Sequence, residues 1–82
     1  MSIKIVPGRR GYYLKVDGLF LSHDFNNHIR MIKNNHDKAP YGATEWTSVD
    51  VIRDYWEKFR KSIIEGLKNP YESKNGELIK IK

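Results

Sequence analysis

Cysteine is absent from this 82-residue sequence, and its absence excludes two classes of protein. Without cysteine there is neither a disulfide framework of the kind that holds small secreted domains together nor a thiolate metal site. The sequence also has no apolar run long enough to span a bilayer and no hydrophobic segment typical of a signal peptide. We therefore expect a cytoplasmic protein without membrane association and, since the chain begins at Met1, a complete small protein.

Motifs that carry catalysis are equally scarce. The sequence contains no phosphate-binding loop, no Gly-rich dinucleotide fingerprint and no nucleophile motif. Asp24 and His28 stand four residues apart, but two ligands are too few for a metal. The segment Asn35-His36-Asp37 would suit the acid–base centre of a nuclease, yet no second carboxylate cluster accompanies it. We predict a protein that is not an enzyme and needs no metal or cofactor, with a nuclease as the alternative.

Positive charge is what the chain has in excess, with a formal net charge of +5. Residues 1–41 hold seven Lys and Arg against three Asp and Glu, whereas residues 42–82 hold eight against seven. The excess is therefore concentrated in the N-terminal half. Such an asymmetry favours a polyanion or an acidic protein surface as partner.

A β-hairpin is predicted over residues 12–16 and 19–22, because Asp17-Gly18 separates two apolar runs. A two-residue turn of type I′ needs positive φ at both positions, which Asp-Gly readily provides. Such a turn also sets the register of the two strands. The expected cross-strand pairs are Val16–Leu19, Lys15–Phe20, Leu14–Leu21 and Tyr13–Ser22.

The two faces of this hairpin differ in chemistry, because cross-strand partners share a face. Leu14, Val16, Leu19 and Leu21 form an apolar core surface. Tyr13, Lys15 and Phe20 place two rings and a cation on the outer face. The core does not need rings there, whereas stacking on an unpaired base does. A dimer interface or simple β-propensity would also explain them.

Two helices are predicted in the remainder of the chain. The first begins at a cap on Ser22 or Asp24, places Phe25, Ile29 and Ile32 inward and ends at Asn34-Asn35. Residues 35–46 form a long connection. The second helix spans residues 48–68. Its expected apolar stripe is Ile52, Tyr55, Trp56, Phe59, Ile63 and Leu67, and its outer face pairs Asp54 with Lys58 and Glu57 with Lys61.

Short strands complete the expected fold. Residues 3–5 alternate in the manner of a strand, and residues 78–82 form a closing strand with Ile79 and Ile81 inward after a turn at Asn75-Gly76. We predict one α+β domain over residues 1–82, with the order β-β-β-α-α-β. A small antiparallel sheet would have both helices packed on one face.

The face opposite the helices is the predicted binding surface. Its cations would contact phosphates and its rings would stack on bases, a combination found in proteins that bind single strands. We predict a small basic protein that binds RNA or single-stranded DNA. The alternative is a protein-interaction or inhibitor protein that uses this basic face against an acidic partner, and a homodimer suits either function. The predicted nucleic-acid-binding residues are Lys4, Arg9, Arg10, Tyr13, Lys15, Phe20, Lys80 and Lys82.

Two resemblances accompany this interpretation. The segment Gly11-Tyr12-Tyr13-Leu14-Lys15-Val16-Asp17-Gly18-Leu19-Phe20-Leu21 is loosely similar to three-stranded DNA-binding domains such as integrase arm-binding modules, although this chain adds a second helix and a closing strand. The short, Lys- and Asn-rich, cysteine-free chain as a whole resembles small early accessory proteins of T4-like bacteriophages. That resemblance implies a role in host takeover or in countering host defence, exerted by binding rather than by catalysis.

Overall fold

The computed structural model describes residues 1–33, 42–74 and 77–81. Within these residues it contains seven strands and one helix. No helix in the described part of the chain is long and apolar enough to cross a membrane. In chain order the elements are β1 (Ile3–Pro7), β2 (Tyr12–Val16), β3 (Leu19–His23), β4 (Ile29–Lys33), β5 (Glu45–Trp46), α1 (Val49–Leu67), β6 (Tyr71–Lys74) and β7 (Glu77–Lys80).

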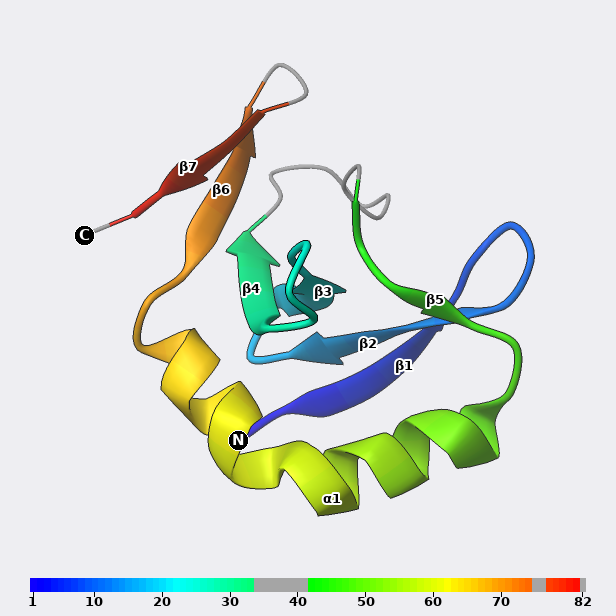
Figure 1. Cartoon of the computed structure of the whole chain (residues 1–82). Helices are drawn as coiled ribbons and strands as arrows, with labels where there is room; N and C mark the ends of the chain where they lie inside the picture. The colour runs from blue at the N-terminus through cyan, green and yellow to red at the C-terminus, as the bar shows by residue number, and fades with distance from the viewer. Residues whose placement is uncertain (34–41, 75–76, 82) are drawn as a thin grey trace.

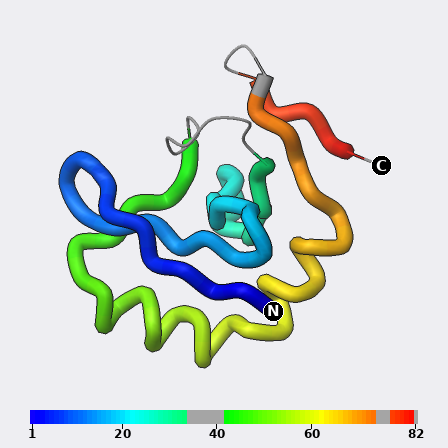
Figure 2. Tube along the Cα trace, turned by 180° about the vertical axis from the view of Figure 1, so that it is seen from behind, coloured from blue at the N-terminus to red at the C-terminus, as the bar shows by residue number. Residues whose placement is uncertain are grey.

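All seven strands belong to one bent sheet, in the order β1-β2-β3-β4-β6-β7 with β5 joined to β2 (Figure 1). Every pairing is antiparallel except that of β4 with β6, which is parallel because α1 lies between them in the chain. Seen from both sides, α1 runs alongside β1, and the β6–β7 hairpin projects from the far end of the helix (Figures 1 and 2).

The predicted β2–β3 hairpin is present, and its turn has the expected conformation. Asp17 has φ 50° and Gly18 has φ 82°, and the pairs Val16–Leu19 and Lys15–Phe20 are confirmed. Farther from the turn the strands separate. Tyr13 there pairs with Glu45 of β5, and Ser22 forms a bridge with Ala43, so the predicted Tyr13–Ser22 pair is wrong.

The first predicted helix does not form. The predicted fold with two helices packed on one face of the sheet is therefore also wrong. Asp24 begins a tight turn rather than a helix, because its Oδ1 accepts hydrogen bonds from the amides of Asn26 and His28 at 2.8 and 2.9 Å. Asn27 adopts φ 62° in that turn, and Phe25 is fully exposed instead of buried. The chain then returns as β4, which pairs with β3 along its whole length.

The helix predicted over residues 48–68 is confirmed as α1. The Ser48 side chain caps it by accepting a hydrogen bond from the Asp50 amide. Its surface ion pairs join Glu57 to Arg60 and Glu65 to Lys68, three residues apart rather than the predicted four. The charges on α1 thus largely neutralise one another.

The core lies between α1 and the apolar face of the sheet. Its fully buried members are Leu14, Val16, Leu21, Met31, Ile52 and Ile63, with Trp56 partly buried against them. Leu14, Val16 and Leu21 of the predicted hairpin core face and Ile52 and Ile63 of the predicted helix stripe are therefore buried as expected. Phe59 of that stripe is instead 36% exposed and lies where the backbone of α1 departs from helical geometry, at φ −114° and ψ 22°.

The C-terminal region forms a hairpin rather than a single closing strand. β7 spans Glu77–Lys80 and pairs with β6, a strand that the sequence analysis did not identify. Ile79, expected inward, is 48% exposed. The predicted turn at Asn75-Gly76 and the predicted contact residue Lys82 lie outside the described residues.

Candidate nucleic-acid interface

A single row of cross-strand partners crosses the sheet and contains four of the predicted contact residues. Each member is the Cα partner of the next, so all of them share one face. This is the face opposite the core, as the sequence indicated for the hairpin. The row is Lys4, Lys15, Phe20, Ile32, Tyr71 and Lys80.

Charge on this face has one sign over most of its area. Strand alternation adds Tyr13 and Arg30 to it, each two residues from a member of the row. Among the described residues of β1, β2, β3, β4, β6 and β7, no Asp or Glu occupies a position on this face. The exception in the sheet is Glu45 of β5, which pairs with Tyr13.

The middle of the row is buried, and here the predicted exposure of Phe20 is wrong. Phe20 is 1% exposed and its partner Ile32 is fully buried. The Phe20 ring meets the ring of Tyr13 edge-on at 6.1 Å, and the Lys15 Nζ lies 5.2 Å from its centroid. Phe20 therefore holds the neighbouring ring and cation in place and is not itself available to stack on a base. The accessible parts of the face are its two ends.

The first end is formed by β1, β2 and the turn between them. Arg9 and Arg10 are exposed in this turn, and Lys4 and Lys15 are cross-strand partners three residue pairs farther along the ladder than Pro7 and Tyr12, which adjoin the turn. The turn is fastened by a 2.6 Å hydrogen bond from the Gly8 amide to the Gly11 carbonyl and by a 2.7 Å bond from the Arg10 amide to Glu45. Five predicted contact residues thus belong to this end of the sheet, with Arg9 and Arg10 in the turn and Lys4, Tyr13 and Lys15 along the ladder.

Tyr13 is held as a hydrogen-bond donor at this first end. Partial burial and the adjacent Glu45 carboxylate both raise the pKa of its hydroxyl above the ordinary value of 10.0. The hydroxyl is consequently protonated at neutral pH. Tyr13 therefore presents an uncharged ring two residues from Lys15 on the same face, and an aromatic ring with a nearby cation suits base stacking.

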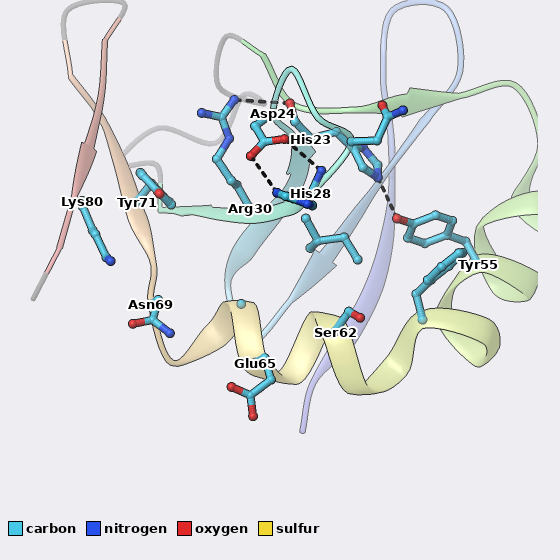
Figure 3. A pocket seen from close by; sticks show the side chains of 14 residues that line it. His23, Asp24, His28, Arg30, Tyr55, Ser62, Glu65, Asn69, Tyr71 and Lys80 are labelled. Carbon is cyan, nitrogen blue, oxygen red and sulfur yellow. Dashed lines mark hydrogen bonds and ion pairs between the residues drawn. The ribbon is translucent and has the colours of Figure 1, made fainter.

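The second end contains a cleft of about 850 Å³ between α1, the β3–β4 turn and the β6–β7 hairpin (Figure 3). Arg30, Tyr71 and Lys80 of the sheet face line it on one side, with Tyr55 and Phe59 of α1 on the other. The Arg30 guanidinium lies over the Tyr71 ring, 5.7 Å from its centroid. Lys80 is the cross-strand partner of Tyr71, so two cations flank one ring.

His23 organises the inner wall of this cleft. Its Nδ1 lies 2.7 Å from Thr44 Oγ1 and its Nε2 lies 2.7 Å from the Tyr55 hydroxyl, so it joins β3, the segment before β5 and α1 (Figure 3). Burial lowers the pKa of His23 below 6.5, against a smaller opposing effect of Asp24. The imidazole is therefore neutral at physiological pH and fixes the Tyr55 side chain by hydrogen bonding.

Acidification is expected to destabilise the protein through His23. Because the folded pKa lies below the unfolded value of 6.5, the free energy of unfolding falls as the pH drops through 6.5 toward the folded pKa and then levels off. Thermal unfolding measured between about pH 7.5 and pH 5 should show this decline in the parent and a flatter profile in His23→Gln. Identical profiles for the two proteins would contradict it. The pKa of Asp24 is lowered, mainly by the hydrogen bond from the His28 amide. Protonation of Asp24 therefore affects the free energy of unfolding only at a more acidic pH.

Arg30 and Tyr71 belong to this face but were missed by the sequence analysis. Arg30 had been placed late in a helix that does not form, and Tyr71 lies in a strand that was not predicted. An alternating pattern over residues 29–33, with Ile29 and Met31 on the core side, was the signal that could have placed Arg30 on the outer face. Among the described residues, no group of three or more His, Asp or Glu side chains is placed to hold a metal ion.

Comparisons with known proteins add no evidence about the function of this site. No protein-family model, no curated protein sequence and no solved structure matches this chain.

Proposed function

We propose that this protein binds single-stranded nucleic acid, RNA or single-stranded DNA, through the basic face of its sheet. The observation that supports this function is the row from Lys4 to Lys80, which has cations at both ends and no carboxylate among its members. Five steps between neighbouring strands separate Lys4 from Lys80 by about 24 Å along the sheet, so a strand of several nucleotides would be needed to reach both accessible ends.

A single strand is favoured over a duplex by the position of α1. An α-helix or a two-stranded ribbon is what enters the major groove, and the one helix of the described chain packs on the opposite face of the sheet. That helix carries four acidic and four basic residues, so it has no excess positive charge to attract phosphates. Rings beside cations, as at Tyr13 and Tyr71, suit bases that are already unstacked. Such a cytoplasmic binding protein fits the phage accessory or counter-defence role that the resemblance implies.

Replacing both Arg9 and Arg10 with glutamine is expected to weaken binding of short labelled oligo(U) and oligo(dT) without unfolding the protein, because both side chains are exposed in a turn. The parent's affinity should fall steeply with salt. Each lost phosphate contact should reduce the slope of log affinity against log salt by about 0.7. Fluorescence anisotropy at several NaCl concentrations measures both quantities.

The matched control replaces Arg53 and Lys61 of α1 with glutamine, which removes the same charge from exposed positions outside the row and the cleft. Equal losses of affinity in the two double variants would indicate net charge alone rather than a site. A salt titration without slope in the parent would contradict binding to phosphates.

Binding to an acidic protein is the second candidate, and the edges of the sheet favour it. β1 and β7 end the strand order, and each carries an exposed isoleucine: Ile3 is 42% exposed and Ile79 is 48% exposed. Unpaired edges with apolar side chains allow strand addition by a partner or by a second copy of the chain. Sedimentation of the purified protein with and without oligonucleotide separates a dimer from a monomer that binds a strand.

A further inference from the structure

We infer that the cleft between α1, the β3–β4 turn and the β6–β7 hairpin binds one nucleotide, with its phosphate at Arg30 and Lys80 and its base against Phe59. The inference deepens the proposed function, because it assigns to this cleft one nucleotide of the bound strand. A free nucleoside monophosphate also has one phosphate and one base, so both it and an oligonucleotide are candidate ligands.

The first argument comes from Arg30, whose guanidinium forms no ion pair within the described part of the chain. Its Nη2 donates to the His23 carbonyl oxygen at 3.3 Å, which positions the guanidinium without cancelling its charge. Its Nε is buried and has no hydrogen-bond partner among the described residues. Such an arginine, placed over the Tyr71 ring, is prepared for an anionic acceptor, and a phosphate matches the fork of its donors.

Asp24 interacts electrostatically with this arginine, yet its oxygens form their close contacts within the turn. Oδ1 accepts from the amides of Asn26 and His28, and Oδ2 lies 3.6 Å from the His28 ring. The other acid that lines the cleft, Glu65, is paired with Lys68 at 3.4 Å and points away from the sheet side chains (Figure 3). Neither Arg30 nor Lys80 thus forms an ion pair within the described residues, so both side chains can contact an anionic ligand.

The second argument is the aromatic wall on α1. The Phe59 and Tyr55 rings are 4.5 Å apart, and Tyr55 is fixed by its hydrogen bond to His23. Phe59 is the member of the predicted core stripe that the fold leaves 36% exposed, and it lines the cleft. An exposed ring backed by a fixed ring is a stacking surface for a base.

Size and polar groups complete the match. The volume of about 850 Å³ lies within the range of pockets that hold small organic ligands. Ser62, Asn69 and Asn27 also line the cleft and offer donors and acceptors for a base edge. Tyr71 and Lys80 line the cleft and are also members of the row, so a strand bound along the row would place one nucleotide at the cleft.

The test titrates the parent with the four nucleoside monophosphates and with short oligo(U) and oligo(dT), followed by nitrogen-15 NMR. Arginine Nε–H groups are visible in such spectra, so the Arg30 resonance reports directly on the cleft. We expect monophosphates and oligonucleotides to shift it. Lys80→Gln should weaken both ligands about tenfold, because it removes a charge-assisted contact. Ser62→Trp, which fills the cleft from an exposed helical position, should abolish monophosphate binding.

Lys61→Gln is the matched control, since it removes a lysine of α1 that belongs to neither the row nor the lining of the cleft and should leave monophosphate affinity unchanged. Binding of oligonucleotides without a shift at Arg30, and with full affinity in Ser62→Trp, would overturn the cleft assignment and leave the proposed function standing. Monophosphate binding in the cleft without any oligonucleotide binding would overturn the proposed function instead. No binding of either ligand would overturn both.

Discussion

Replacing Gly11 with alanine is expected to lower the free energy of unfolding by about 3 kcal/mol or more, because the added methyl group has no space. A side chain at position 11 would overlap the backbone carbonyl of Trp46. That carbonyl belongs to β5, whose pairing with Tyr12 and Tyr13 fills the gap where β2 and β3 separate. The overlap with backbone cannot be relieved by rotating a side chain, so the two segments must move apart.

Gly18→Ala is the matched control for this prediction. Gly18 has φ 82° but open space around its Cα, so alanine there meets only the strain of a left-handed conformation, about 1 kcal/mol. Urea denaturation of both variants, followed by tryptophan fluorescence, gives the comparison. If Gly11→Ala were no less stable than Gly18→Ala, the close approach of the Gly11 and Trp46 backbones would be contradicted.

The parts of the fold that were predicted correctly are those fixed by local chemistry. Asp17-Gly18 determines a turn, the turn determines the register of Lys15 with Phe20, and the apolar spacing of α1 continues for five turns. Asp24 shows the limit of such reasoning. An aspartate that caps a helix and one that closes a tight turn both accept hydrogen bonds from nearby backbone amides. The pairing of β4 with β3 determines that Asp24 closes a turn here.

The candidate interface was predicted in part for a similar reason. Alternation along a strand tells which side chains share a face, and it placed Lys4, Lys15 and Lys80 on one face. It does not tell what covers that face, so Phe20 was expected in solvent and is buried. Arg30 and Tyr71 meet only because β4 and β6 pair in parallel after the whole of α1, a contact that no local pattern encodes.

The apolar stripe of α1 is divided between the core, where Ile63 is buried, and the cleft, which Phe59 lines. Ile63→Ala is expected to lower the free energy of unfolding by about 2–5 kcal/mol, because it leaves a cavity in a fully buried site. Phe59→Ala, although it removes a larger side chain, should cost only about 1 kcal/mol, since its ring is partly exposed and its main contact is with Tyr55. Urea denaturation of the two variants measures the difference.

The same pair of variants separates stability from binding. Ile63→Ala should bind nucleoside monophosphates like the parent under conditions in which it is folded, because Ile63 does not line the cleft. Phe59→Ala should be nearly as stable as the parent and yet lose affinity by about 1–3 kcal/mol, the contribution of one stacked base. A large loss of stability in Phe59→Ala would mean that its ring belongs to the core after all, and the stacking surface on α1 would have to be abandoned.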